Sequence, residues 1–318
     1  MRSINDIFNT KLDNTIVTLG KFDGSHIGHQ LLFDTAISLK KDDLKTVIFT
    51  FDLPPQSVCG ERAGTDLKTI MTRDEANFRQ YEDRIDYIVF FPVNKETMSM
   101  SPEKFVRDIL CDRLGVKTVV VGEDFRFGKG RSGDVALLRQ LGKEMAFDVV
   151  ALKKVTYRLS GTDREYEVSS TLIKEEILKG NLDDVTAMLG HPFSIKGRIV
   201  HGKHFGSVMG FPTINFEARD NKILPPDGVY ATFTEIDGSR YLSVTNIGSR
   251  PTFDDGEHRT VETNILYFNR DVYGREAEVF FKHFIRNEKK FNSMEELKAQ
   301  IEEDKESVKK FYSCDLNC

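Results

Sequence analysis

Two histidines three residues apart are the first candidates for chemistry in this chain. His26 and His29 lie in the segment TIVTLGKFDGSHIGHQLLF, where a predicted strand runs into Gly20, turns through Asp23-Gly24 and enters a helix. A helix N-terminus presents unpaired N–H groups and a partial positive charge, and glycines let the backbone approach a ligand closely. Two imidazoles there can donate hydrogen bonds to phosphoryl oxygens. The spacing therefore indicates a phosphate-binding loop that handles a nucleotide.

Two other interpretations of these histidines stay open. They can flank an ordinary tight turn, or they can share one helical face and hold a metal ion, because residues three apart are neighbours on a helix. A metal site would need further ligands. The remaining histidines all lie in the C-terminal half, at positions 191, 201, 204, 258 and 283.

Two further segments fit the phosphate interpretation. The stretch GEDFRFGKGRSGD combines four glycines with Arg126, Lys129 and Arg131, and it predicts a basic loop over a polyphosphate. Taken alone, it is equally typical of a solvated turn. The Ser-Ser-Thr segment at 169–171 precedes a predicted helix and offers hydroxyl and N–H groups to an anion, although such a segment is also an ordinary helix cap.

A second group of candidate residues follows in the C-terminal half. The segment GFPTINF places Thr213 and Asn215 two residues apart on a predicted strand, so their oxygen atoms face the same way. Such a pair can ligate magnesium, which prefers oxygen ligands and keeps substrate phosphates close. Glu262 lies in an apolar strand, where a carboxylate is costly unless it is paired or used. A structural role on the solvent face is the alternative for Glu262.

The N-terminal half alternates short apolar runs with helical patterns. The expected strands are Thr15–Leu19, Thr46–Phe51, Tyr87–Val93, Thr118–Gly122 and Asp148–Val155. The expected helices are Gly28–Lys40, Arg73–Tyr81, Pro102–Leu114 and Asp134–Met145. This βαβα order predicts an α/β domain with a parallel sheet covered by helices.

The C-terminal half has a different pattern. From Ile195 to Phe284, short β-rich segments are separated by Gly, Pro and Asp turns without intervening helices, which predicts a small antiparallel β-barrel. Ser293, with Glu296 three residues later, is a capping-box pattern and predicts a C-terminal helix through about Phe311.

Two short helices are expected between these halves. One follows the segment 169–171 and ends near Gly180, and the next ends at Gly190. We place the domain boundary near residue 187, so that the predicted domains are 1–187 and 188–318.

Composition excludes several classes of protein. The 318 residues are 39% hydrophobic and 30% charged, enough apolar material for two cores. The net charge of −5 argues against binding to a nucleic-acid backbone. No apolar run approaches the ~20 residues that cross a membrane. Four cysteines without C-x-x-C spacing predict reduced thiols in a cytoplasmic protein.

The N-terminal motifs carry a specific resemblance. In their order and spacing, GKFDGSHIGH, VVVGEDFRFGKGRSGD and SSTLIK resemble the adenylyltransferase module of bacterial bifunctional riboflavin kinase/FAD synthetases, a Rossmann-like H-x-G-H nucleotidyltransferase. The resemblance implies transfer of AMP from ATP to FMN, with magnesium assisting and no covalent enzyme intermediate. It implies that His26 and His29 hold the ATP phosphates. The other residues that it assigns to nucleotide or flavin are Gly20, Asp23, Gly24, Asp124, Ser170, Thr171 and Lys174.

Two positions depart from the family pattern. The family has a histidine in the segment that corresponds to Phe51–Pro55, and this chain has FDLPP there. The family also carries an arginine where this chain has Lys174. Arginine offers a bidentate fork to phosphate and lysine only a point charge. We therefore expect the adenylyltransferase half to be the weaker one.

The C-terminal motifs resemble the riboflavin kinase domain of the same enzymes. GFPTIN is the most distinctive of them, and LPPDGVYAT, VETNILYFNRDVYG and FIRNEKKF follow in order. The resemblance implies that Thr213 and Asn215 bind magnesium and ATP phosphates and that Glu262 is the base facing the ribityl 5′-hydroxyl. It places Arg286 near the flavin-side helix. Gly210 belongs to one of two expected flaps, the turn 202–210 and the segment 248–256.

Together the motifs predict an enzyme of flavin cofactor synthesis. ATP, riboflavin and FMN are the expected small-molecule substrates, Mg²⁺ the expected cofactor, and neither nucleic acid nor membrane an expected partner. The sequence leaves open whether the chain forms a homo-oligomer. One alternative is a riboflavin kinase with a weakened or inactive adenylyltransferase domain, and another is a flavin-binding regulatory protein without turnover.

Overall fold

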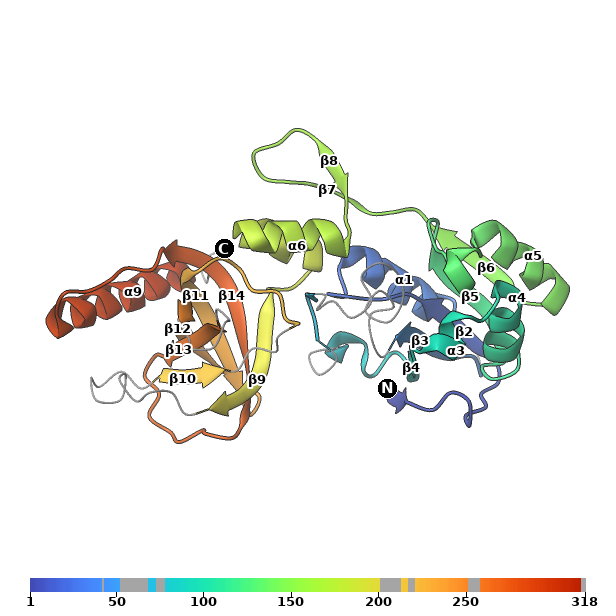
Figure 1. Ribbon diagram of the computed structural model, residues 1–318, viewed down its shortest axis with the longest axis horizontal. Coiled ribbons are helices and arrows are strands. Elements are labelled where there is room, and N and C mark those ends of the chain that lie inside the picture. The colour runs from blue at the N-terminus through green and yellow to red at the C-terminus, as the bar shows by residue number, and fades with distance from the viewer. Residues whose placement is uncertain are drawn as a thin grey trace. The chain divides into compact units, whose positions relative to one another are not determined.

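The computed structural model describes residues 1–41, 43–51, 68–72, 78–200, 213–216, 221–250 and 258–315. The chain divides into two compact units, Met1–Ser170 and Thr171–Cys318, and Figure 1 traces the elements of both. The boundary near residue 187 stays a prediction. In the part of the chain that is described, no helix is both long and apolar enough to cross a membrane.

The first unit contains a six-stranded parallel sheet in the order β1–β4–β3–β2–β5–β6. The expected parallel sheet is confirmed, and the edge strand β1 is an addition to it. β4 ends before Pro92, whose ring carries no N–H for the sheet. The strands are β1 (Arg2–Ile4), β2 (Thr15–Leu19), β3 (Lys45–Phe51), β4 (Tyr87–Phe91), β5 (Val116–Gly122) and β6 (Asp148–Leu152).

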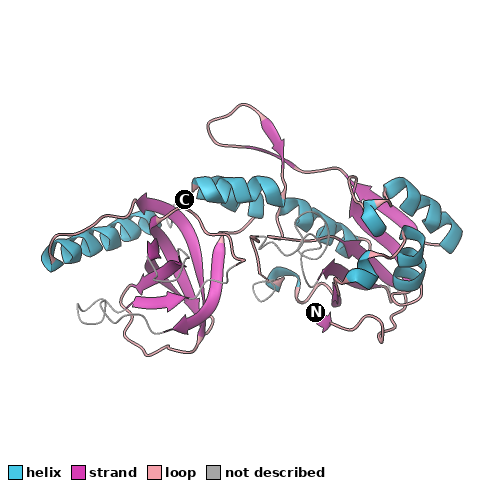
Figure 2. Ribbon diagram, in the orientation of Figure 1, coloured by secondary structure: helices cyan, strands magenta, loops and turns pink. Residues whose placement is uncertain are grey.

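Alternate residues of the central strands pack into two different cores. On one face Leu19 and Phe49 join a core with Leu138 of α5 (Val135–Met145). On the other face Ile16 and Ile48 pack with Phe33 of α1 (Ile27–Ser38). Because both faces of the sheet are covered, the sequences of these strands are continuous apolar runs. Figure 2 shows the helices that surround this sheet.

The remaining helices of this unit differ in detail from expectation. The predicted helix from Pro102 to Leu114 begins as α4 (Pro102–Lys104), which Ser101 caps by accepting a hydrogen bond from the Lys104 N–H. It continues as a π-helical segment, Phe105–Cys111. Of the helix expected at 73–81, only a 3-10 turn at Arg79–Tyr81 lies within the described residues. The sequence pattern did not predict α3 (Lys95–Met98) or the hairpin of β7 (Thr156–Arg158) and β8 (Glu165–Glu167).

The strand order reverses direction beside β2. Along the chain the sheet grows from β2 to β3 and β4 on one side, and then continues with β5 and β6 on the other. Where an open α/β sheet reverses in this way, a crevice forms outside the carboxyl ends of the strands. Gly20 directly follows β2 and Gly122 ends β5, so both lie at that crevice.

The second unit is a closed antiparallel barrel in the order β10–β13–β12–β11–β14–β9. The expected barrel is confirmed. Its strands are β9 (Ser194–Val200), β10 (Thr213–Phe216), β11 (Gly228–Ile236), β12 (Ser239–Arg250), β13 (His258–Ile265) and β14 (Glu276–Arg286). Inside the barrel, buried hydroxyl groups of Thr232, Ser243, Thr245 and Thr263 hydrogen-bond to one another.

Three helices accompany the barrel. The helix α6 (Ser170–Lys179) begins where the two units divide, and α7 (Leu182–Leu189) ends at Gly190, as expected. The C-terminal helix α9 (Met294–Asp315) begins after Ser293, whose hydroxyl accepts a hydrogen bond from the Glu296 N–H. The predicted capping box is thus half formed, because the Glu296 carboxylate accepts instead from the N–H of Asn292.

The packing of α7 against β14 predicts how much of the chain the barrel needs. A fragment that begins at Thr171 should be more stable than one that begins at Gly190, because the shorter fragment lacks α7, whose buried apolar side chains are Leu182, Val185, Met188 and Leu189. At roughly 1.5–3 kcal/mol for each buried apolar side chain, we expect a difference of at least about 3 kcal/mol in the free energy of unfolding. Urea unfolding followed by circular dichroism measures it, and equal midpoints would contradict this packing.

Candidate active sites

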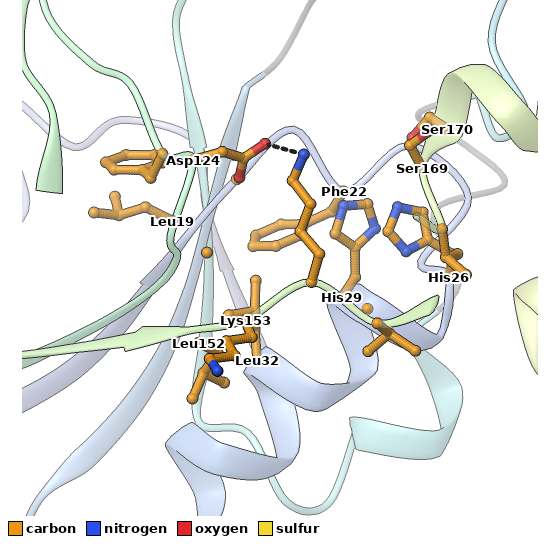
Figure 3. A pocket seen from close by; sticks show the side chains of 17 residues that line it. Leu19, Phe22, His26, His29, Leu32, Asp124, Leu152, Lys153, Ser169 and Ser170 are labelled. Atoms are coloured by element: carbon orange, nitrogen blue, oxygen red, sulfur yellow. Dashed lines mark ion pairs between the residues drawn. The ribbon is translucent and has the colours of Figure 1, made fainter. Parts of the chain in front are cut away.

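A pocket of about 270 Å³ lies at the crevice beside β2 (Figure 3). His26 and His29 from the start of α1 line it, together with Gly20 after β2, Asp124 after β5 and Ser170 at the start of α6. The structure therefore brings together five residues that the family resemblance assigned to nucleotide or flavin. The other lining residues are Leu19, Phe22, Gly28, Leu32, Gly122, Phe125, Leu152, Lys153, Lys154, Val155, Val168 and Ser169.

The two histidines form one stacked unit. Their ring centroids are 3.6 Å apart with an interplanar angle of 19°, and the ring of Phe22 meets His29 edge-on at 5.1 Å. A Cβ at Gly28 would lie 3.2 Å from the His26 ring, so glycine leaves the imidazole its place. At Gly20 a Cβ would lie 2.5 Å from the Phe22 ring, and only glycine fits there.

The Nδ1 atoms of both imidazoles are buried, although the His29 side chain as a whole is only half-buried. His26 is 6% exposed, and among the described residues its Nδ1, the Nδ1 of His29 and the hydroxyl of Ser25 have no hydrogen-bond partner. Burial lowers the pKa of His26 to about 4, although Asp23 opposes this shift. Burial, and then the neighbouring His26, lower the pKa of His29 well below its ordinary value. At neutral pH the pair is therefore uncharged. Each neutral ring carries one N–H that can donate a hydrogen bond to a ligand.

The expected nucleotide loop is held by Asp23. Its Oδ1 accepts hydrogen bonds from the N–H groups of Ile70 at 2.9 Å and Met71 at 3.2 Å. Its backbone carbonyl accepts the hydroxyl of Ser170 at 2.8 Å, which ties the start of α6 to the loop. Gly24 follows with a φ of +90°, a conformation that favours glycine. Asp23 and Gly24 thus shape the loop, and its contact with a nucleotide stays a prediction.

Asp124 lies on a wall that two pockets share. Together with Leu19, Gly20 and Phe125, it also lines a second pocket of about 390 Å³. The second pocket is walled by aromatic rings, and the rings of Phe125 and Phe127 stack there at 5.6 Å. The further aromatic residues are Phe49, Phe51, Phe91 and Phe105. Such a pocket suits a flat apolar ring system, whereas the histidine pocket suits an anion.

The glycine-rich basic loop is anchored rather than free. The Lys129 N–H donates to the carbonyl of Met100 at 2.8 Å, and Gly128 lies so close to Pro102 that a Cβ would clash with it at 2.7 Å. Arg126 forms an ion pair with Asp134 at 3.2 Å. Arg126 and Arg131 line the aromatic pocket rather than the histidine pocket. The basic loop that the sequence predicted over a polyphosphate is therefore packed beside the aromatic pocket.

Three further predictions concern the N-terminal half. Thr171 is exposed and Lys174 half-buried on α6, beyond the residue at which the units divide, so their contacts with a nucleotide stay predictions. The departure at Phe51–Pro55 lies outside the described residues except for Phe51, which lines the aromatic pocket. Among the described residues, no three His, Cys, Asp or Glu side chains group as a metal site.

The barrel carries a third pocket, of about 290 Å³, lined by Thr213, Glu262 and Arg286. Glu262 is the cross-strand partner of Asn215 on β10 and of Asn246 on β12, so an amide lies opposite it on each side. Thr213 and Asn215 lie on the same face of β10, as the sequence predicted. Gly210 and the flap 202–210 lie outside the described residues, and the flap 248–256 is described only to residue 250.

Arg286 ties the barrel to the C-terminal helix. Its Nε and Nη2 donate to the two oxygens of Asp304 on α9, at 2.9 and 2.7 Å. Asp304 is 3% exposed, so this bidentate pair is largely shielded from solvent. Arg286 also lines the pocket that Glu262 lines, and it therefore fixes one wall of that pocket.

Sequence reasoning missed some of the residues that line these pockets. Lys154 lines the histidine pocket, but the expected strand Asp148–Val155 placed it inside the sheet, whereas β6 ends at Leu152. Two consecutive lysines after an apolar parallel strand were the available signal, because such strand ends meet at one edge. In the barrel, Asn246 donates to Glu288 at 3.0 Å on the pocket wall, a contact that no motif revealed.

Two family models match the chain, one to each half. The model described as FAD synthetase matches residues 8–171, and the model described as riboflavin kinase matches residues 189–312. Residues 8–171 include every residue that lines the histidine pocket and the aromatic pocket. Residues 189–312 include every residue that lines the barrel pocket.

Curated relatives match almost end to end. A bifunctional riboflavin kinase/FMN adenylyltransferase of Buchnera aphidicola (subsp. Schizaphis graminum) is 33% identical, over 98% of this chain and 99% of the relative. The protein of the same description from Escherichia coli (strain K12) is 35% identical, over 98% of this chain and 97% of the relative. A solved structure described as a macrolide-efflux protein from Streptococcus pneumoniae has a TM-score of 0.83 at 29% identity, covering 96% of this chain and 98% of that one.

The buried imidazoles predict a pH dependence of stability in the absence of nucleotide. The folded chain keeps His26 neutral down to about pH 4, whereas an unfolded histidine takes up a proton near pH 6.5. The unfolded state therefore binds more protons between these values, and stability falls as the pH is lowered through that range. We expect His26 to contribute a loss of about 1–2 kcal/mol between pH 7 and pH 5.

The matched control is the His26→Gln variant, which keeps a polar side chain but cannot titrate. Urea unfolding of both proteins at pH 7 and pH 5 gives the difference between their pH-dependent losses. A variant that loses as much stability as the unmodified chain would show that His26 is not held neutral.

Proposed function

The chain belongs to the family of bifunctional riboflavin kinase/FMN adenylyltransferases, and we propose that its two units divide the two reactions between them. The enzyme phosphorylates riboflavin to FMN with ATP and then transfers AMP from ATP to FMN, which gives FAD and pyrophosphate. We assign FMN adenylylation to the predicted domain 1–187, which contains the whole first unit, and riboflavin phosphorylation to the predicted domain 188–318, which contains the barrel. The observation that supports this division is that each unit has its own polar pocket.

In the N-terminal unit, the histidine pocket is the proposed site of the ATP phosphates. His26 and His29 present neutral imidazoles beside the N-terminus of α1, and a triphosphate would give their buried ring nitrogens the partners they lack among the described residues. Anion binding would also offset the cost of burying these polar atoms. Gly20 lines this pocket and leaves the Phe22 ring its place, and Gly24 gives the loop its positive-φ turn.

The aromatic pocket next to it is the proposed site of the FMN ring. An isoalloxazine is a flat ring system, and the Phe125–Phe127 stack offers it aromatic faces. Asp124 borders both pockets, so a flavin held by these rings would direct its ribityl phosphate toward the wall next to the histidines. Asp124 thus keeps the flavin-side role that the family resemblance implied.

This arrangement supports adenylyl transfer by positioning. A phosphate oxygen of FMN attacks the α-phosphorus of ATP, a new P–O–P bond forms, and the bond to the β-phosphate oxygen breaks to release pyrophosphate. The step needs no covalent enzyme intermediate and no proton from the protein. The imidazole N–H groups and the first turn of α1 can stabilise the charge that shifts onto the leaving pyrophosphate.

In the barrel, Glu262 is the proposed base for riboflavin phosphorylation. Its carboxylate would accept the proton of the ribityl 5′-hydroxyl as that oxygen attacks the γ-phosphorus of ATP, with ADP as the leaving group. The cross-strand amides of Asn215 and Asn246 can hold the carboxylate in place without adding charge. Arg286, through Asp304, fixes the adjacent wall.

The oxygens of Thr213 and Asn215 fit a magnesium ion. They are neutral hard donors on one face of β10, next to Glu262, and Mg²⁺ is commonly held by few protein oxygens together with substrate phosphates. When bound there, the ion would neutralise phosphate charge in the transition state. We also propose the cytoplasm as the compartment, because few cysteines occur and none has C-x-x-C spacing.

Product analysis tests this function directly. Incubation of the chain with riboflavin, ATP and magnesium, followed by chromatography, should yield FMN first and FAD later. FMN without FAD, even when FMN itself is supplied as substrate, would favour the riboflavin kinase with an inactive adenylyltransferase half. Tight flavin binding without consumption of ATP would favour the regulatory protein.

The variant Glu262→Gln should separate the two reactions. Glutamine keeps the shape of the side chain but does not accept a proton at neutral pH, so riboflavin phosphorylation should fall about 10²–10⁴-fold. FAD formation from supplied FMN should stay unchanged, and it serves as the control for folding. An unaltered rate of riboflavin phosphorylation would remove Glu262 from the mechanism.

A further inference from the structure

Lys154 lies next to the wall that the histidine pocket and the aromatic pocket share. Its ammonium is 3.1 Å from Oδ2 of Asp124, the ion pair that the dashed line in Figure 3 marks, and 2.7 Å from Oε2 of Glu167 on β8. Lys154 lines the histidine pocket, and Asp124 lines both pockets. A cation thus stands next to the point at which an anion in one pocket would meet an anion in the other.

The ion pairs of Lys154 hold its ammonium only weakly. The side chains of Asp124 and Glu167 are 64% and 62% exposed, and that of Lys154 is 35% exposed. Ion pairs at such exposure contribute little to stability, because water screens them. The ammonium can therefore exchange one oxygen partner for another at little cost. Both carboxylates raise the pKa of Lys154, Glu167 most strongly, so the ammonium stays charged at neutral pH.

Adenylyl transfer brings two phosphate groups together at this wall. The phosphate of FMN must approach the α-phosphate of ATP, and the carboxylate of Asp124 on the shared wall would repel both. We infer that Lys154 binds the phosphate of FMN, leaving its carboxylate partners when the flavin enters, and so allows that phosphate to approach ATP. This inference rests on the assignment of the N-terminal pockets to FMN adenylylation.

Lys154 takes no part in bond making. The bond that forms joins an FMN phosphate oxygen to the α-phosphorus, the bond that breaks releases pyrophosphate, and the ammonium keeps its protons throughout. Its contribution is to the binding and placement of FMN, and the KM for FMN should therefore carry most of the effect of removing it. A single charge-assisted contact to phosphate corresponds to about a ten- to hundredfold change in binding.

The test is the steady-state rate of FAD formation from FMN and ATP by the full chain. Lys154→Met should raise the KM for FMN about ten- to hundredfold and leave the KM for ATP within about threefold. Lys154→Arg should restore most of the affinity, because the positive charge returns. The matched control is Lys143→Met: Lys143 is an exposed lysine of α5 in the same unit and lines none of the three pockets. It should change neither constant by more than about threefold. Riboflavin phosphorylation should be normal in all variants.

Glu167→Gln separates phosphate binding from a structural ion pair. If Lys154 only anchors the β7–β8 hairpin through Glu167, this variant should reproduce the defect of Lys154→Met. If Lys154 binds phosphate, Glu167→Gln should leave the KM for FMN unchanged or lower it. An unchanged KM for FMN in Lys154→Met, an equal rise in both KM values, or a matching defect in Glu167→Gln would each overturn the inference. An unmodified chain that forms no FAD from FMN would overturn the assignment of the pocket as well.

Discussion

The N-terminal site depends on the reversal of strand order beside β2. Because β3 lies on one side of β2 and β5 on the other, the loops after β2 and β5 diverge, and the crevice between them receives the start of α1. That crevice holds the Nδ1 atoms of two imidazoles away from water, and no described residue pairs with them. Burial of this kind lowers stability in the free chain and prepares the site for an anion, since the hydrogen-bond donors are in place before the ligand arrives.

In the barrel, the register of the paired strands positions the carboxylate of Glu262. Glu262 lies between Asn215 and Asn246 only because β10, β13 and β12 pair in this register, and a slip by one residue would turn its side chain to the barrel interior. The interior hydroxyl groups of Thr245 on β12 and Thr263 on β13 hydrogen-bond to each other at 2.9 Å and favour this register. The two units thus position acidic or imidazole groups by different means, one by the end of a parallel sheet and the other by cross-strand pairing.

The sequence predicted the parallel sheet, the barrel and the C-terminal helix because their hydrophobic patterns are regular over several residues. It also predicted the members of both sites that lie in compact motifs, such as His26, His29 and Thr213. It did not predict the aromatic pocket, because its phenylalanines come from β3, β4, the π-helical segment Phe105–Cys111 and the loop after β5, which only the fold brings together. Lys154 was missed for a local reason: the strand ends three residues earlier than its apolar pattern suggested.

In the free protein the stacked histidines are neutral, and their N–H groups are positioned to donate hydrogen bonds to the phosphates of ATP. NMR observation of the imidazole nitrogens of His26 and His29 in the full chain tests it most directly. Two neutral rings are expected at pH 7 without ligand, and both sets of signals should shift when ATP is added. Rings that are charged at pH 7 in the free protein, or signals that do not respond to ATP while FAD is still formed, would contradict the account.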